Sequence, residues 1–139
     1  MATFSSDVTP YFRLGEFSVV TELLDILDMV KHDKGSTATK EAIESLTSDL
    51  LVIGNRPEAP DIAVLLTDGA SKTGDVSTAV TTSVAAGIEF YVVAVSTSEL
   101  NMTELSFIAS DPDASHLIIA EDFNSIPALS YEIEKNKDI

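Results

Sequence analysis

The stretch from Asp61 to Gly69 constrains the fold more than any other part of the sequence. It reads Asp-Ile-Ala-Val-Leu-Leu-Thr-Asp-Gly, with five apolar residues in a row. The run is too short for a buried helix and lacks the alternation of a strand with one solvated face, so it predicts a strand buried on both faces. It ends in Thr67-Asp68-Gly69, which puts a hydroxyl and a carboxylate at the carboxyl end of the strand, where open α/β folds bind ligands. Asp68 could hold a cation there. The alternative is an Asx-turn, because Asp-Gly is a common turn pair.

Strand-like and helix-like segments alternate along the rest of the chain. Besides the strand at 61–67, we expect strands at 1–4, 11–14, 88–95 and 117–120, and helices at about 18–31, 37–52, 76–84, 100–109 and 126–133. Pro10 suggests an edge position for the strand at 11–14, and Gly87 stands where a helix-ending glycine is expected. The alternation predicts an α/β fold with a doubly wound, mostly parallel sheet and helices on both faces. No linker or repeat interrupts it, so we expect one domain over residues 1–139.

Composition removes several classes of protein. The chain has 139 residues, no apolar run of the length of a membrane span, and 23 acidic against 8 basic residues, for a net charge of -15. This charge argues against binding to a nucleic-acid backbone and favours cations or basic partners, although a solvated acidic surface is the simpler explanation. The absence of cysteine excludes disulfides and thiolate metal sites. We see no signal peptide at Met1, so a targeting segment is either absent or lies upstream.

The remaining polar candidates have ordinary explanations. His32 falls in a charged loop and His116 at the start of a strand, and no nucleophile motif accompanies either. A solvated acidic rim explains the acids near the last strand, which are Asp111, Asp113, Glu121 and Asp122. Asn101-Met102-Thr103 is an N-glycosylation sequon, which weakly favours an extracellular location.

Five short segments carry a resemblance to a known family. In chain order they are Ala2-Thr3-Phe4-Ser5, Gly35-Ser36-Thr37-Ala38-Thr39, Leu66-Thr67-Asp68-Gly69, Leu105-Ser106-Phe107-Ile108-Ala109-Ser110 and Glu121-Asp122-Phe123. Together they resemble the von Willebrand factor type A domain over nearly the whole chain. The resemblance implies a doubly wound sheet with a metal-ion-dependent adhesion site at its C-terminal edge. In that family Mg²⁺ or a similar cation is held by an Asp-x-Ser-x-Ser loop, a loop threonine and the Thr-Asp-Gly aspartate, and a ligand carboxylate completes the shell.

Carried over residue by residue, the resemblance makes Thr37 and Asp68 metal ligands for Mg²⁺, or for Mn²⁺ or Ca²⁺. The sequence contains no Asp-x-Ser-x-Ser, and Asp75-Val76-Ser77-Thr78-Ala79 fails at its last position. We therefore expect an N-terminally truncated domain that lacks the first strand, and a metal site that is weak or absent. The alternative is a natural chain that dispenses with this strand.

Three functional classes stay open. The first is a non-enzymatic adhesion module, extracellular as the resemblance implies, that binds a matrix or cell-surface protein through the C-terminal edge of the sheet. The second is a structural A domain with an inert metal site. The third is a Mg²⁺-dependent α/β enzyme that uses Asp68, although we find neither a second catalytic acid nor a phosphate-binding element. An unpaired strand edge left by the missing strand would favour self-association.

Overall fold

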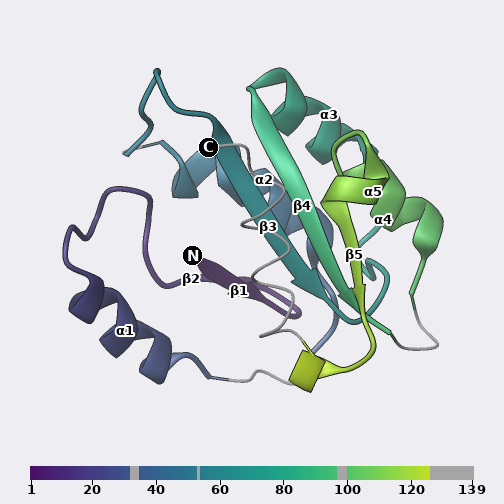
Figure 1. Cartoon of the computed structure of the whole chain (residues 1–139), viewed down its shortest axis with the longest axis horizontal. Coiled ribbons are helices and arrows are strands. Elements are labelled where there is room, and N and C mark those ends of the chain that lie inside the picture. The colour runs from purple at the N-terminus through teal and green to yellow at the C-terminus, as the bar shows by residue number, and fades with distance from the viewer. Residues whose placement is uncertain (32–34, 53, 97–99, 126–139) are drawn as a thin grey trace. The chain divides into compact units, whose positions relative to one another are not determined.

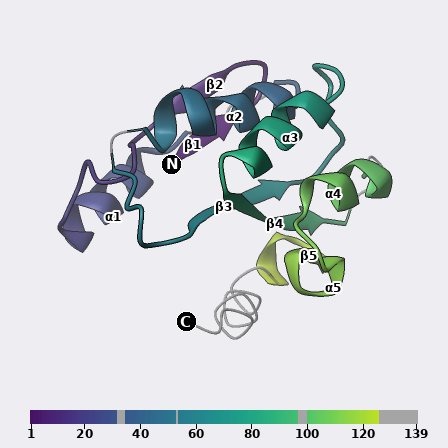
Figure 2. The same cartoon turned by 90° about the horizontal axis from the view of Figure 1, so that it is seen from above.

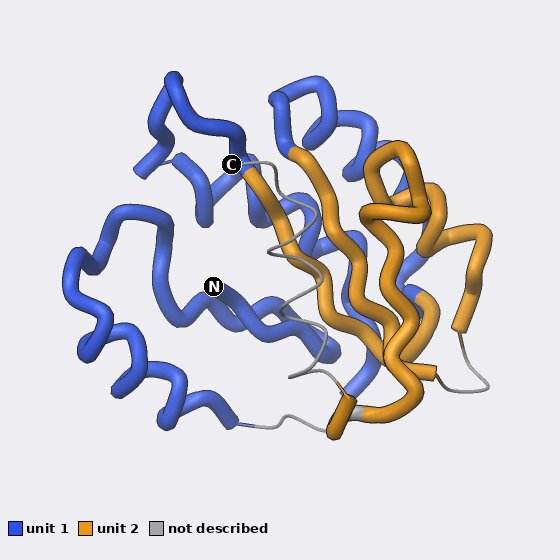
Figure 3. The backbone as a smooth tube through the Cα atoms, in the orientation of Figure 1, with its two compact units in different colours: residues 1–61, 71–88 blue, residues 62–70, 89–139 orange. Residues whose placement is uncertain are grey.

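The computed structural model describes residues 1–31, 35–52, 54–96 and 100–125. The chain forms two compact units, which Figure 3 colours separately. Unit 1 comprises residues 1–61 and 71–88, and unit 2 comprises residues 62–70 and 89–139. The single domain over residues 1–139 stays a prediction.

A three-stranded sheet forms the centre of unit 2. Its strands are β3 (Asp61–Thr67), β4 (Ile88–Val95) and β5 (Leu117–Ala120), in the order β3-β4-β5. β4 and β5 pair in parallel from Val92 opposite Leu117 to Val95 opposite Ala120, and Figure 1 shows β3 and β4 running in the same direction. The three strands match the predicted ranges, and the predicted α/β class is confirmed.

The strands differ in how completely they are buried. β4 is buried at every position except Glu89, as a parallel strand between two covered faces should be. β3 was expected to be buried on both faces, and this is wrong. Its residues alternate, with Ala63, Leu65 and Thr67 buried while Val64 and Leu66 are 53% and 45% exposed. β3 is the outer strand of the described sheet, and on one face no described element covers these two side chains.

Two short helices accompany the sheet in unit 2. They are α4 (Met102–Ile108) and α5 (Asp113–His116), followed by the 3₁₀ turn η2 (Phe123–Ser125). Figures 1 and 2 both place α4 and α5 on the β5 side of the sheet. Leu105 and Ile108 are each 1% exposed, so α4 is anchored by its apolar face. The helix predicted at 100–109 is confirmed in shortened form, and the one predicted at 126–133 lies outside the described residues.

Unit 1 begins with a hairpin. β1 (Ala2–Phe4) and β2 (Val8–Pro10) pair in antiparallel fashion around a turn at Ser5-Ser6-Asp7, with Phe4 opposite Val8 and Ala2 opposite Pro10. The strand predicted at 11–14 is therefore wrong. The turn sets the register, so strand pairing ends at Pro10. The N–H groups of Tyr11 and Phe12 do not extend the ladder, because both donate to the carbonyl oxygen of Met1.

Helix α1 (Val20–Met29) confirms the predicted helix at 18–31 but not its burial. None of its residues is buried, and Val20, Leu24 and Leu27 are 68%, 54% and 45% exposed. The period of 3.6 residues was sufficient to predict the helix. The period does not reveal which element covers the apolar stripe of α1, and no described element buries this stripe.

The helix predicted at 37–52 divides into α2 (Thr39–Ser45) and a turn of π-helix, η1 (Leu46–Leu50). α2 contacts β1, β2 and α3 (Ser77–Ala85), and the core of unit 1 gathers there around Ile43, Leu50, Val76 and Val80. Gly87 follows α3 with a φ of +90°, the left-handed conformation that ends a helix. Among the described helices, none is long and apolar enough to cross a membrane.

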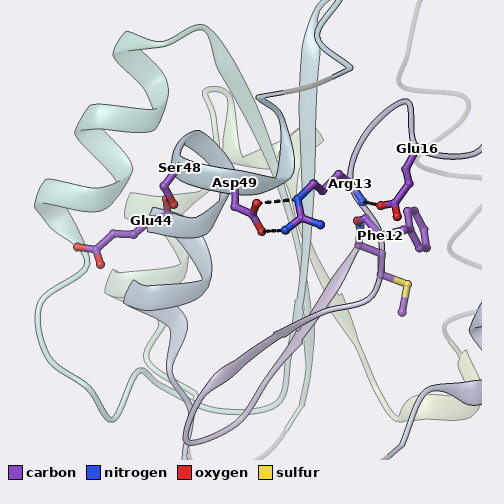
Figure 4. A network of polar contacts seen from close by, with 7 residues as sticks. Phe12, Arg13, Glu16, Glu44, Ser48 and Asp49 are labelled. Carbon is purple, nitrogen blue, oxygen red and sulfur yellow. Dashed lines mark hydrogen bonds and ion pairs between the residues drawn. The ribbon is translucent and has the colours of Figure 1, made fainter.

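A bidentate ion pair ties η1 to the segment after the hairpin. Arg13 Nε and Nη2 lie 2.7 and 3.1 Å from the two carboxylate oxygens of Asp49 (Figure 4). The Leu14 N–H also donates to the Leu50 carbonyl at 2.9 Å. The Arg13 N–H also donates to Glu16 at 2.9 Å. The pKa of Arg13 is raised, first by the hydrogen bond to Asp49 and then by its charge. No sequence pattern indicates this pair, because its two residues are 36 positions apart.

Candidate metal-binding loops

The loop that carries Thr37 is fixed to the hairpin turn of unit 1. The Ser36 N–H donates to Ser6 Oγ at 3.2 Å, and the Ala38 N–H donates to the Ser5 carbonyl at 2.8 Å. Gly35 lies so close to this turn that a Cβ atom there would stand 2.8 Å from Ser6 Oγ and 2.9 Å from Ser6 N. Only glycine therefore fits without a shift of the turn. The consequence is a defined backbone path for Thr37, whose side chain is half-buried.

Residues 72 and 73 hold the Thr37 loop from a second direction, again within unit 1. The Lys72 N–H donates to the Thr37 carbonyl at 2.9 Å, and the Thr73 hydroxyl donates to Glu41 Oε2 at 2.5 Å. The Thr73 hydroxyl, followed by the backbone of Glu41, lowers the pKa of the Glu41 carboxyl below its usual value. The Thr37 main-chain oxygen is thus occupied by Lys72, so the side-chain hydroxyl is the Thr37 group to consider for a cation.

Asp75, which begins the Asp-x-Ser triplet at the start of α3, has a local role. Its Oδ1 accepts from the Ser77 N–H at 2.9 Å, and its Oδ2 accepts from the Ser77 hydroxyl at 2.6 Å. Both bonds lower the pKa of Asp75, and the bond from the Ser77 hydroxyl has the larger effect. They form the turn that starts α3, and the carboxylate is satisfied within two residues of itself.

Asp68 follows the last residue of β3, in unit 2. The preceding Thr67 is 6% exposed, and its hydroxyl donates to the Gly69 carbonyl at 3.0 Å and accepts from the Gly69 N–H at 3.4 Å. The turn after β3 is therefore held by the threonine hydroxyl, while the Asp68 side chain is exposed. A carboxylate at this place can meet a ligand or a cation from solvent.

The two predicted ligands lie in different units, Thr37 in unit 1 and Asp68 in unit 2. Their joint role as a metal site stays a prediction. Within the described ranges, no three histidine or acidic side chains are grouped so that they could hold a metal ion. The acids Asp111, Asp113, Glu121 and Asp122 are all exposed, which agrees with an acidic rim. His32 lies outside the described residues.

Sequence reasoning missed a polar pair in unit 2 that consists of a buried histidine and a partly exposed glutamate. His116 ends α5 instead of starting a strand, is 6% exposed, and places Nε2 2.8 Å from Glu89 Oε1 on β4. Its Nδ1 lies 3.0 Å from the Pro112 carbonyl oxygen, and its ring centre is 4.5 Å from that of Tyr91. Glu89 was the available signal, since it is the one charged residue in the otherwise apolar strand at 88–95. A charge in such a strand needs a partner.

Known proteins similar to this chain share its family. The sequence profile of the von Willebrand factor type A domain matches residues 1–132. The collagen alpha-1(XII) chain of Notophthalmus viridescens is 28% identical over 98% of this chain, and mouse matrilin-2 is 31% identical over 95% of it. This chain spans only 14% of the length of each of those two proteins.

A solved structure agrees at the level of the fold. Proximal thread matrix protein 1 from the mussel byssus, with a zinc-occupied MIDAS motif, superposes with a TM-score of 0.88 over 97% of this chain and 35% of its own, at 21% identity. The predicted resemblance is confirmed by the profile match, which extends over nearly the whole sequence. The chain belongs to the von Willebrand factor type A domain family.

Proposed function

We propose that this chain is a non-enzymatic, extracellular protein-binding module of the adhesion type, which contacts its protein ligand at the carboxyl end of the sheet around Asp68. The observation that carries the proposal is the exposed Asp68 carboxylate directly after the buried Thr67 of β3. Ligands of open α/β sheets bind at this end of the strands. The matrix relatives, a collagen chain and matrilin-2, support the adhesion type.

The proposal includes a divalent cation held weakly by the Asp68 carboxylate and the Thr37 hydroxyl. Zinc in the mussel protein supports a divalent ion. One carboxylate and one hydroxyl leave most of a six-oxygen Mg²⁺ shell to water, so we expect an affinity on the order of millimolar. The ion would supply positive charge for a ligand carboxylate.

A second candidate function is a structural domain that associates with its own kind. It is favoured by the outer strand β3, where Val64 and Leu66 are exposed on one face. Outer strands with exposed apolar side chains tend to pair with further strands. In this case binding would not depend on Asp68 or on a cation.

Adhesion to decellularised extracellular matrix separates the two functions. The wild-type chain should be retained on a matrix-coated surface in the presence of Mn²⁺, and both EDTA and Asp68→Ala should release it. Glu58→Ala, which removes another exposed carboxylate, is the matched control and should bind like the wild type. If Asp68→Ala and EDTA both left retention unchanged, binding through the carboxyl end of the sheet around Asp68 would be contradicted. The structural function would then be the supported one.

A further inference from the structure

One motif of the sequence has no part in the proposed function, namely the triplet Asn101-Met102-Thr103 in unit 2. The chain has three other asparagines, at 55, 124 and 136, and none of them begins a sequon. Asn101 immediately precedes α4, in an extended conformation with φ -103° and ψ 93°. All three residues of the triplet are exposed, so the acceptor amide and the threonine hydroxyl lie at the surface.

The side chain of Asn101 has two ends, and the fold uses one of them. Its carbonyl oxygen Oδ1 accepts a hydrogen bond from the Glu104 N–H at 3.3 Å, which caps the first turn of α4. A glycan is attached to the other end, the amide nitrogen Nδ2. Because the glycosylated amide keeps its carbonyl oxygen, modification and capping are compatible at this residue.

Two apolar side chains of α4 are exposed, and one of them, Met102, follows Asn101 directly in the sequence. Met102 on α4 is 47% exposed and Phe107 is 50% exposed. A glycan attached at Asn101 would add bulky, hydrophilic surface at this end of α4.

We propose that Asn101 is an N-glycosylation site whose glycan sits at the start of α4 and leaves the helix cap intact. In the transfer step, Nδ2 of Asn101 attacks the anomeric carbon of a lipid-diphosphate-linked oligosaccharide. The new C–N bond forms as the bond from that carbon to the diphosphate oxygen breaks, the lipid diphosphate leaves, and the proton lost from Nδ2 passes to a base of the transferase. The inference rests on the proposed extracellular location, because such donors act in the secretory pathway.

The test is secretion of the 139-residue chain, behind a cleavable signal, from a eukaryotic host, followed by intact-mass measurement before and after treatment with peptide N-glycosidase. We expect one glycan on the wild type and on Thr103→Ser. We expect none on Thr103→Ala, which keeps the Asn101 cap, or on Asn101→Asp. Asp75→Asn serves as the positive control, because it creates an Asn-Val-Ser triplet whose acceptor position is exposed at the start of α3.

A secreted wild type without sugar, alongside a glycosylated second site in Asp75→Asn, would overturn the proposal. The cap is tested separately on unglycosylated protein from bacteria. Asn101→Ala should unfold about 2–6 °C below Asn101→Asp, since aspartate also caps helices and alanine does not. Cation binding at Asp68 is measured on the same bacterial protein, so a failed glycosylation test leaves the proposed function standing.

Discussion

Replacing Glu89 with glutamine should destabilise the protein at mildly acidic pH and have little effect at alkaline pH. The side chain of Glu89 and the carbonyl of Pro112 are both hydrogen-bond acceptors, and they face the two ring nitrogens of His116 at 2.8 and 3.0 Å. A neutral imidazole can donate to only one of them, whereas the imidazolium donates to both. The folded structure therefore favours the protonated histidine.

The direction of the pKa change follows from the surroundings of His116. Burial lowers its pKa, but the hydrogen bond to Glu89, the Pro112 carbonyl and the negative charges of Glu89 and Asp111 outweigh burial and raise the pKa above 6.5. The aromatic ring of Tyr91 packs on the same imidazole. A raised folded-state pKa means that the stabilisation is fully present below pH 6.5 and is lost as the pH rises through the higher value.

The size of the effect follows from the type of hydrogen bond. A charge-assisted bond contributes roughly 1.5–3 kcal/mol and a neutral bond roughly 0.5–1.5 kcal/mol. Glu89→Gln exchanges the first for the second, and the Glu89 side chain is 39% exposed, so solvent screening keeps the difference near 1 kcal/mol. For a chain of 139 residues this corresponds to a Tm decrease of about 3–5 °C.

Thermal unfolding followed by circular dichroism between pH 5.5 and 8.5 measures this difference. The Tm gap between the wild type and Glu89→Gln should be widest at pH 5.5 and should close toward pH 8.5. Glu58→Gln, at an exposed position, controls for the loss of one negative charge. A gap of constant size at every pH, or one that widens as the pH rises, would refute the reasoning.

Two further predictions concern the core and the outer strand. Phe90→Ala, at a side chain that is 1% exposed, should lower the free energy of unfolding by about 3–5 kcal/mol in urea titrations, whereas Phe107→Ala, at 50% exposure, should cost little. An equal loss in both would contradict the assigned core. If β3 mediates self-association, Val64→Lys should lower the average mass in light scattering and Val84→Lys, at an equally exposed valine of α3, should not. A wild type that is monomeric at all concentrations would argue against association through β3.

The sequence predicted those elements whose signal is local. The strands at 61–67, 88–95 and 117–120 were predicted at their observed bounds, because short apolar runs with turn residues on either side are characteristic of buried parallel strands. The helix at 18–31 was predicted from its period. The apolar residues themselves do not reveal which elements cover them, and this is why the burial of Val64 and Leu66 was predicted wrongly.

The sequence does not reveal which backbone groups pair with one another, either within the hairpin or between distant segments. The strand after the first turn was placed at 11–14, because only the register between Phe4 and Val8 shows that pairing ends at Pro10. Of the candidate site, sequence and family resemblance supplied Thr37 and Asp68. The contacts that hold the Thr37 loop, above all the Lys72 N–H, depend on parts of the chain far apart in sequence and appear only in the fold.

The proposed function depends most directly on a weak cation site at Asp68, and titration calorimetry with Mg²⁺ and Mn²⁺ tests for this site. The chain has Thr37 and Asp68 but no Asp-x-Ser-x-Ser among its 139 residues, so we predict a dissociation constant on the order of millimolar in the wild type. Heat of binding should be absent in Asp68→Ala and retained in Glu58→Ala. Micromolar binding that disappears in Asp68→Ala would show a complete site and contradict the predicted weakness, and binding that is equal in Asp68→Ala and the wild type would contradict the site itself.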